Sequence, residues 1–345
     1  MKVIHIPDTI EINDDIRSLT SVVCHSLSDV PDIIDTWNEG KVVDIEGYYE
    51  NAKINRVYVD RVHVKKAFAE YTAAYNADDP KIKLKIDHTY RVAALCERIA
   101  KAAGMCAYDV ELAWLSGMLH DVGRFEQIKR YNTFSDADSV DHAKFGADLL
   151  FKDGLISTFL KGMVKCTGYK PGALEDRYDS DGVFLYDRLN KSDMEMLELA
   201  IRCHNMYRIP QGLNCREQAF CNVLRDADKV DIFKVNIDTP LEEIYNTTTE
   251  ELMKSDITDE VLEAFDEEHC ILKAIRRTPA DTVIGHVSLA YELVYDESVR
   301  ITVEQGYLAK LMHFHSDNEE TNRKMAMVRE KMDSYVKKRI VEKDA

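Results

Sequence analysis

The sequence predicts an all-α fold. Apolar residues make up 45% of the 345 residues, and along most of the chain they recur at the spacings of three and four that one face of a helix requires. Only 7 prolines and 14 glycines are present, whereas a fold of many short strands and tight turns needs more of both. The 31% of charged residues suits a globular protein with a substantial core.

Residues 1–58 depart from this pattern, because their isoleucines, valines and tyrosines form short runs typical of extended segments. We expect a short N-terminal extension of mixed or weak strand content there, and assign it no role. The remaining residues, 59–341, are expected to form one helical domain.

Successive helices follow from the apolar spacing and the chain breakers. A helix that buries Val64 and Phe68 is expected to end before Pro80, and the next one to stop at Gly104. Asp109 is a candidate N-cap for a third helix, which carries a strongly apolar stretch.

The same spacing predicts further helices over about 192–204 and 216–235, and a helical C-terminal region over 258–341. The polar, glycine-bounded segment 168–182 is expected to form a surface loop.

The charge of the chain excludes some functions. Its 45 Lys and Arg against 62 Asp and Glu give a net charge of −17, which repels a nucleic-acid backbone and disfavours binding to membrane surfaces. A small anionic substrate remains compatible, because a bound metal ion reverses the local field inside a pocket.

The 8 cysteines form no Cys-x-x-Cys pair and are scattered along the chain, which indicates free thiols in a reducing compartment. Neither a secretory leader nor a run of roughly 20 apolar residues is recognisable. We therefore expect a cytoplasmic protein without a membrane span. A helical domain of this size allows an oligomer, but no heptad pattern specifies one.

Six polar side chains lie near the inward faces of separate predicted helices or at their ends. Buried imidazoles and carboxylates require a partner or a metal ion, and this mixture suits first-row transition metals. Each residue taken alone is also explained as a core histidine, a helix cap or an ion-pair partner, so the residues by themselves leave both readings open. The six are His88, His120, Asp121, His142, His204 and Asp228.

The segments 86–92, 119–124 and 224–230 read Ile-Asp-His-Thr-Tyr-Arg-Val, Leu-His-Asp-Val-Gly-Arg and Leu-Arg-Asp-Ala-Asp-Lys-Val. They resemble the motifs of the HD-domain phosphohydrolase superfamily and occur in its order: His, then His-Asp, then Asp. The histidines in 141–143 and 201–205 resemble the extra histidines of its two-metal members. The resemblance covers about residues 60–240.

This resemblance implies an HD-domain helical bundle with a metal site within 86–231. It also implies divalent transition-metal ions drawn from Mn, Fe, Ni, Co or Zn, and the six-ligand set implies two of them. Such ions activate water for hydrolysis of a small phosphate ester. The implied ligands are His88, His120, Asp121 and Asp228 for the first ion, and Asp121, as a bridge, with His142 and His204 for the second.

Three arginines near these ligands, Arg91, Arg124 and Arg208, are candidates for holding phosphate. We favour Arg124 as a catalytic residue beside Asp121, because its segment adjoins the metal site. Asp231 could orient a ligand from outside, but we expect it to be an ordinary carboxylate on the helix surface.

The chain departs from the cyclic-dinucleotide phosphodiesterases of the superfamily. Their paired His-His-Glu is replaced by His204-Asn205 without the glutamate, which leaves the substrate open among nucleotides, other phosphomonoesters and phosphodiesters. Two alternatives stay open: a di-iron oxygenase with the same ligand set, and a regulatory module that binds a metal or nucleotide without turnover.

Overall fold

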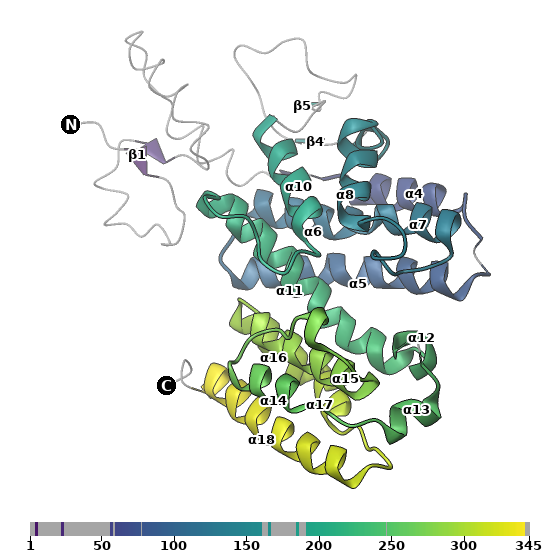
Figure 1. Cartoon of the computed structure of the whole chain (residues 1–345). Coiled ribbons are helices and arrows are strands. Elements are labelled where there is room, and N and C mark those ends of the chain that lie inside the picture. The colour runs from purple at the N-terminus through teal and green to yellow at the C-terminus, as the bar shows by residue number, and fades with distance from the viewer. Residues whose placement is uncertain are drawn as a thin grey trace.

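The computed structural model describes residues 59–76, 78–160, 191–245 and 247–341, together with five two-residue strands. The described part is helical, as predicted, and its helices form two bundles joined by one long helix (Figure 1). The residues expected to form the surface loop 168–182 lie outside the described residues.

The strands are β1 (Ile4–His5), β2 (Val22–Val23), β3 (Arg56–Val57), β4 (Lys165–Cys166) and β5 (Phe184–Leu185). The first two pair in parallel, with Ile4 opposite Val22. The other three form an antiparallel sheet in the order β3-β4-β5.

The first bundle contains the helices from α4 to α10, among which α5 and α6 form the closest pair. In chain order they are α4 (Arg61–Thr72), α5 (Pro80–Ala102), α6 (Ala107–Leu119), α7 (Val122–Tyr131), α8 (His142–Ala147), the π-helical turn η2 (Asp148–Lys152), α9 (Ile156–Leu160) and α10 (Lys191–Cys203).

Helix α5 begins and ends where the chain chemistry dictates. The Asp79 side chain accepts a hydrogen bond from the backbone N–H of Lys81, and Pro80 occupies the first turn, where its missing N–H costs nothing. After the helix, Gly104 adopts a positive φ of 74°, a conformation that glycine takes without strain. The predicted stop at Gly104 is therefore confirmed.

The predicted cap of α6 is wrong. The helix begins at Ala107, and Asp109 lies within its first turn rather than before it. Its carboxylate accepts hydrogen bonds from Arg216 instead, with a distance of 2.7 Å to the Nη2 atom. The Asp109 side chain, which the local sequence predicts to cap the helix, thus forms a long-range ion pair with Arg216 instead.

Helix α11 (Cys215–Asp238) leaves the first bundle and runs along the second (Figure 1). It starts with a capping box between Asn214 and Glu217. It packs against α5, α6 and α10, and it also contacts α16 and α17 of the second bundle.

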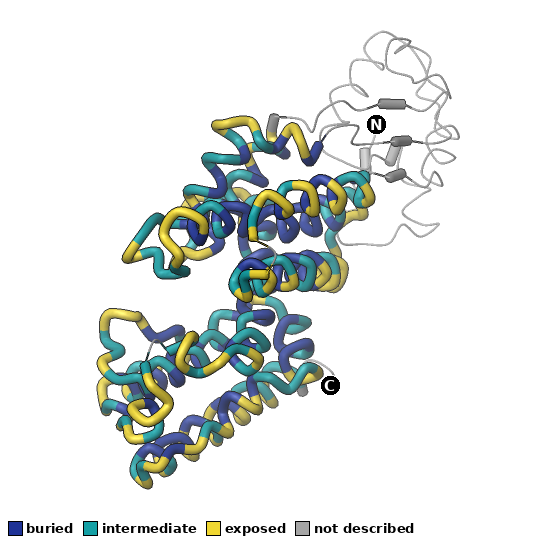
Figure 2. Tube along the Cα trace, turned by 90° about the vertical axis from the view of Figure 1, so that its right-hand side faces the viewer, coloured by how far each residue is buried: buried dark blue, intermediate teal, exposed yellow. Residues whose placement is uncertain are grey.

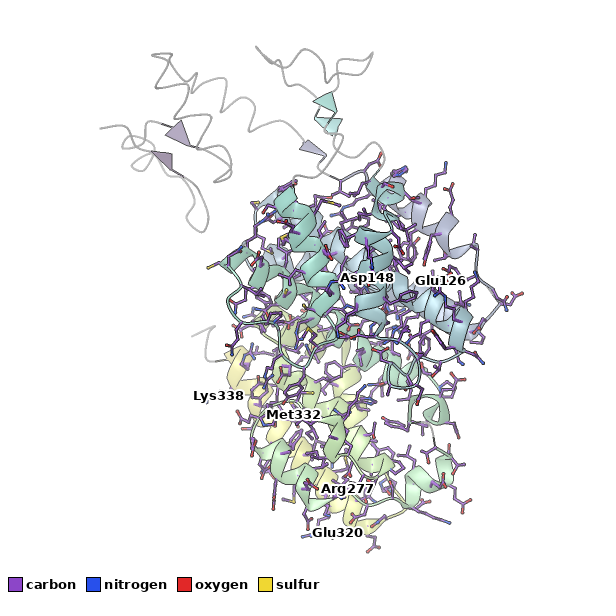
Figure 3. The ribbon with its side chains drawn as sticks, turned by 45° about the horizontal axis from the view of Figure 1, so that its top comes forward. Glu126, Asp148, Arg277, Glu320, Met332 and Lys338 are labelled. Atoms are coloured by element: carbon purple, nitrogen blue, oxygen red, sulfur yellow. The ribbon has the colours of Figure 1, made fainter. Side chains whose placement is uncertain are left out.

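The second bundle follows α11 and is formed by short helices with one long helix, α18, along one side (Figure 1). They are α12 (Leu241–Tyr245), α13 (Thr249–Lys254), α14 (Asp259–Asp266), η3 (Lys273–Ile275), α15 (Pro279–Val287), η4 (Ser288–Glu292), α16 (Asp296–Gln305), α17 (Tyr307–Met312) and α18 (Glu319–Val341). Among labelled side chains, Glu126 and Asp148 belong to the first bundle and Arg277 and Glu320 to the second (Figure 3).

Buried residues lie on the inner faces of the helices in both bundles (Figure 2). In the first bundle, the rings of Phe68 and Phe125 meet edge to face with their centroids 5.9 Å apart. Helices α5 and α6 lie so close that a Cβ atom on Gly117 would be 2.6 Å from the Cα atom of Ala93. This tight core fixes the helix ends that carry the polar cluster. None of the helices in the described ranges combines the length and apolar character that crossing a membrane requires.

Candidate metal centre

The six polar side chains singled out in the sequence converge in the first bundle. They come from five places: His88 on α5, His120 and Asp121 between α6 and α7, His142 at the start of α8, His204 directly after α10, and Asp228 on α11. Five of the six side chains are at most 5% exposed, and Asp228 is 17% exposed.

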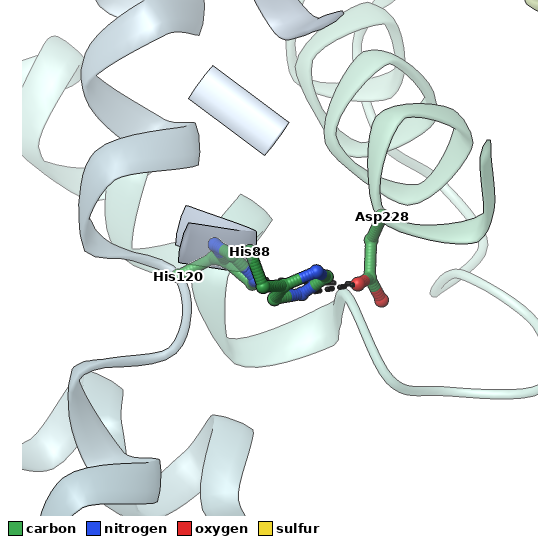
Figure 4. Close-up of side chains that lie close together, drawn as sticks. All are labelled: His88, His120 and Asp228. Carbon is green, nitrogen blue, oxygen red and sulfur yellow. Dashed lines mark hydrogen bonds and ion pairs between the residues drawn. The ribbon is translucent and has the colours of Figure 1, made fainter. Parts of the chain in front are cut away.

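The first group surrounds one oxygen of Asp121. The Nε2 atoms of His88 and His120 lie 3.6 and 3.4 Å from Asp121 Oδ2 and 3.4 Å from each other. Asp228 Oδ1 closes the group, 3.1 Å from His88 Nε2 and 4.0 Å from His120 Nε2 (Figure 4).

The second group surrounds the other oxygen of the same carboxylate. The Nε2 atoms of His142 and His204 lie 3.5 and 3.7 Å from Asp121 Oδ1. These two nitrogens are 3.1 Å apart. Asp121 therefore stands between two histidine pairs, with one oxygen atom facing each.

The outer nitrogen of every ring in the cluster has a partner. The Nδ1 atoms of His120 and His204 lie 2.7 Å from the carbonyl oxygens of Gly117 and Ile201. Because a carbonyl oxygen only accepts, each Nδ1 atom donates its proton, which leaves the Nε2 lone pair free. This arrangement is typical of histidines that bind metals.

The remaining two rings are held by carboxylates. His88 Nδ1 lies 2.6 Å from Asp231 Oδ2, and His142 Nδ1 lies 2.7 Å from Asp136 Oδ2. A carboxylate behind the ring fixes its orientation and makes the inner nitrogen a stronger ligand.

One feature of the cluster itself shows that these residues fit a metal ion. Asp121 Oδ1 is buried and has no hydrogen-bond partner, although an unpaired buried charge is costly. The groups that face it, His142 Nε2 and His204 Nε2, offer lone pairs rather than protons. A cation among the three atoms would be a partner for all of them. Two His/Asp clusters could each hold a metal ion: one of His88, His120 and Asp228, and one of His120, Asp121 and His204.

The electrostatics of the cluster also favour a cation. Burial alone would raise the pKa of Asp121, but Lys85, His120 and His142 hold it well below its usual range. Burial, His142 and His120 lower the pKa of His204 to about 3, so this ring stays neutral. Burial and Lys85 lower the pKa of His88, but hydrogen bonds to Asp228 and Asp231 outweigh them and raise it. The first group therefore attracts a positive charge, whether proton or metal.

Residues 86–233, which contain all six side chains, match the family model of the HD domain. The chain contains an HD domain. Comparison with curated proteins and with solved structures finds no match. Most HD domains belong to metal-dependent phosphohydrolases, and they typically bind divalent metal ions.

The three candidate phosphate-binding arginines occupy different positions around the HD domain. Arg91 Nε donates to Asp231 Oδ1 at 2.6 Å, and its Nη2 atom donates to Asp231 Oδ2 at 2.9 Å. Arg208 forms an ion pair with Glu292 at 2.5 Å, and its side chain is 56% exposed. The structure therefore brings neither guanidinium against the six-residue cluster.

Arg124 lies closest to the cluster, with its Nε atom 3.8 Å from Asp121 Oδ1. Its Nη1 atom donates to Gln127 Oε1, to the carbonyl oxygen of Phe134 and to Asp136 Oδ1, at 2.6, 2.7 and 2.9 Å. Arg124 thus holds the segment that carries Asp136, and through it the ring of His142.

The expectation of a surface carboxylate at Asp231 is wrong. Asp231 is 1% exposed and forms hydrogen bonds with both His88 and Arg91. Asp231 lies three residues after Asp228 on α11, so both carboxylates point to the same side of the helix. That shared face was the signal in the sequence.

Sequence reasoning missed two residues of the site. Lys85 Nζ donates to Asp121 Oδ2 at 2.6 Å, and it lies three residues before His88 on the same face of α5. Asp136 orients His142 from the segment before α8. The helix start is capped by the Asp141 side chain, which accepts from the N–H of Lys144, but nothing local marks Asp136.

Proposed function

We propose that this protein is a metal-dependent phosphohydrolase that cleaves a small phosphate ester with two divalent metal ions. One observation carries the proposal: Asp121 presents one oxygen to His88 and His120 and the other to His142 and His204. A carboxylate shared in this way suits a bridge between two ions, and both sets contain the nitrogen and oxygen ligands of first-row transition metals.

The first ion would be held by His88, His120, Asp121 and Asp228, and the second by Asp121, His142 and His204. Ions bound there would activate water and neutralise charge on the phosphoryl group. Mn, Fe, Ni, Co and Zn all accept this ligand set.

The chain's own residues prepare the site. Asp231 and Asp136 fix the rings of His88 and His142, and the backbone carbonyls of Gly117 and Ile201 fix the other two. Rigid ligands reduce the reorganisation needed when charge develops on the phosphoryl oxygens.

The exposed fractions indicate the side from which substrate would enter. Asp228 and Lys85 are each 17% exposed at the side chain, whereas the other ligands are at most 5% exposed. The cluster therefore opens to solvent beside these two residues, which suits entry of a small ester. The net charge of −17 opposes a polyanionic one.

The test is metal content per chain by elemental analysis, with phosphatase activity measured on the same samples. We expect about two ions in the wild type, about one in His142→Ala, and loss of both ions and activity in Asp121→Ala. His313→Ala, which replaces an exposed histidine of the second bundle, is the matched control and should retain both ions.

About one ion in both the wild type and His142→Ala would overturn the dinuclear site. Two ions without hydrolysis of any phosphate ester would favour the regulatory module. Iron with oxygen uptake would favour the oxygenase.

A further inference from the structure

The cationic side chains around the centre differ in what they already bind. Arg91 is paired with Asp231 and Arg208 with Glu292. Arg124 makes three hydrogen bonds through its Nη1 atom alone. A guanidinium that is already paired with a carboxylate has less to offer an incoming phosphate, because the pair must separate first.

Lys85 differs from the arginines because it donates a hydrogen bond to a carboxylate of the centre itself, whereas Arg124 Nε lies 3.8 Å from that carboxylate. Its Nζ atom lies 2.6 Å from Asp121 Oδ2, the oxygen that faces His88 and His120. An ammonium group has three donors, and Asp121 Oδ2 is the one acceptor that the structure records for Lys85 Nζ among the described side chains. Two donors of Lys85 thus remain beside the centre.

The surroundings of Lys85 place it at the opening. Its side chain is 17% exposed, the same fraction as that of Asp228. The Nζ atom also lies 5.5 Å from the centroid of the Phe134 ring, and Arg124 Cζ lies 5.8 Å from the same ring. The Phe134 ring therefore lies close to both cations.

We propose that Lys85 binds a non-bridging oxygen of the substrate's phosphoryl group and makes the centre select terminal phosphates, that is phosphomonoesters, over internal phosphodiesters. This inference rests on the proposed function. A terminal phosphate ester carries about two negative charges at pH 7 and three non-bridging oxygens. An internal diester carries one charge per phosphate and two such oxygens.

The charge balance of the chain supports this selection. Asp231 is balanced by Arg91, and Asp136 by Arg124. Lys85 therefore adds a positive charge that no outer carboxylate among the described residues is recorded to neutralise. In a buried site of low dielectric, one additional cation stabilises a dianion more than a monoanion.

The alternative is that Lys85 only neutralises buried Asp121. The two roles predict different effects on metal binding and on the ratio of monoester to diester cleavage. A purely neutralising lysine would change metal binding and affect monoesters and diesters equally, whereas a phosphate-binding lysine changes their ratio and leaves metal content intact.

The experiment compares wild type, Lys85→Met, Lys85→Arg and the control Lys83→Met, which removes an exposed lysine from the same helix. Each protein is loaded with Mn²⁺, its metal content is measured, and kcat/KM is determined for p-nitrophenyl phosphate and bis(p-nitrophenyl) phosphate. Inorganic phosphate is titrated calorimetrically into the same samples, as a readout that does not depend on turnover.

With unchanged metal content, we expect Lys85→Met to lower kcat/KM for the monoester about 100-fold, the effect of losing one preorganised donor. The diester should lose less than about 10-fold on the same basis, and phosphate binding should weaken. Lys85→Arg should restore part of the monoester activity, and Lys83→Met should match the wild type.

Parallel losses for the two esters, unchanged phosphate affinity in Lys85→Met, or loss of metal in that variant would each overturn the inference. If the wild type cleaves neither ester, the proposed function fails. The phosphate titration then still decides whether Lys85 binds a phosphoryl group.

Discussion

His88 connects the centre to a chain of charges behind it. Its Nδ1 atom is held by Asp231, whose two oxygens are in turn bound by Nε and Nη2 of Arg91. Burial would raise the pKa of Asp231, but His88 and Arg91 lower it. Asp231 thus remains ionised, and an ionised carboxylate keeps the Nδ1 proton in place and His88 Nε2 available as a ligand.

Replacement of Asp231 by Asn tests this role. The amide is weaker as an acceptor and can also present its NH₂ group to His88, so we expect the dissociation constant of the metal to rise about 10- to 100-fold. Metal affinity is measured by competition with a chelator. Asp238→Asn is the control, because Asp238 lies on the same helix and forms an exposed pair with Lys234. Equal affinities in the two variants would contradict the role of Asp231.

At the residue scale, the sequence predicted the six cluster residues because their order and motifs mark them. It could predict their second contacts only in part. The spacing of Asp231 from Asp228 indicates a shared helix face, but Asp136 looks like an ordinary carboxylate, since only the fold brings it to His142. In the sequence, Lys85 is one of several lysines on α5, and only the fold brings Asp121 into contact with it.

Helices α7 and α8 meet at a contact that only glycine permits. A Cβ atom on Gly123 would lie 2.4 Å from the carbonyl oxygen of His142 and 2.7 Å from the backbone nitrogen of Gly146. Because these atoms belong to the backbone, the two helices would have to move apart. This contact therefore sets the position of His142 relative to Asp121.

Gly123→Ala should separate the two helices. We expect it to destabilise the protein by about 1–3 kcal/mol, as overpacking does, and to lose the second metal ion because His142 moves. Gly117→Ala provides the comparison: its Cβ atom would lie 2.6 Å from Ala93 at the α5–α6 contact, away from His142. Thermal unfolding and elemental analysis are measured for both. If Gly123→Ala keeps two ions, the contact does not control the site.

At the element scale, the helices could be predicted where breakers and caps are local. Pro80 and Gly104 delimit α5 as expected. The start of α6 was misplaced because Asp109 pairs with Arg216, a residue more than a hundred positions away. Local sequence cannot distinguish a carboxylate that caps a helix from one that forms an ion pair with a residue distant in the sequence.

The two bundles are connected through a buried carboxylate on α11. Asp226 is 0% exposed and accepts hydrogen bonds from the N–H groups of Val294 and Tyr295 and from the hydroxyl of Ser298. These donors lie at the start of α16, where a negative charge is favoured by the helix dipole. Asp226 thus attaches the second bundle to the helix that carries Asp228.

Asp226→Asn should weaken this attachment. The amide NH₂ would face the backbone N–H groups of Val294 and Tyr295, which only donate, and leaving a buried donor unsatisfied costs about 1–3 kcal/mol. Chemical denaturation measures the loss, and proteolysis shows whether α16 opens first. Glu304→Gln, which breaks an exposed ion pair with Arg98, should cost less than about 1 kcal/mol. Equal costs for the two variants would show that Asp226 is not the attachment.

For the whole molecule, the sequence predicted helices after residue 258 but not their grouping around the end of α11. That grouping depends on contacts such as those of Asp226, which join residues about seventy positions apart. The apolar faces of short helices fit many partners, and only the assembled bundle selects among them.

Helix α11 combines these tasks on one rigid rod: Asp226 attaches the second bundle, Asp228 enters the cluster, and Asp231 orients His88. An α-helix turns by about 100° per residue. One residue inserted or deleted between these positions would therefore turn one of the three carboxylates to a different side of the helix. The segment 226–231 should therefore accept changes at its other side chains during evolution but no change of length. Domains fused or spliced to this protein would have to join it elsewhere.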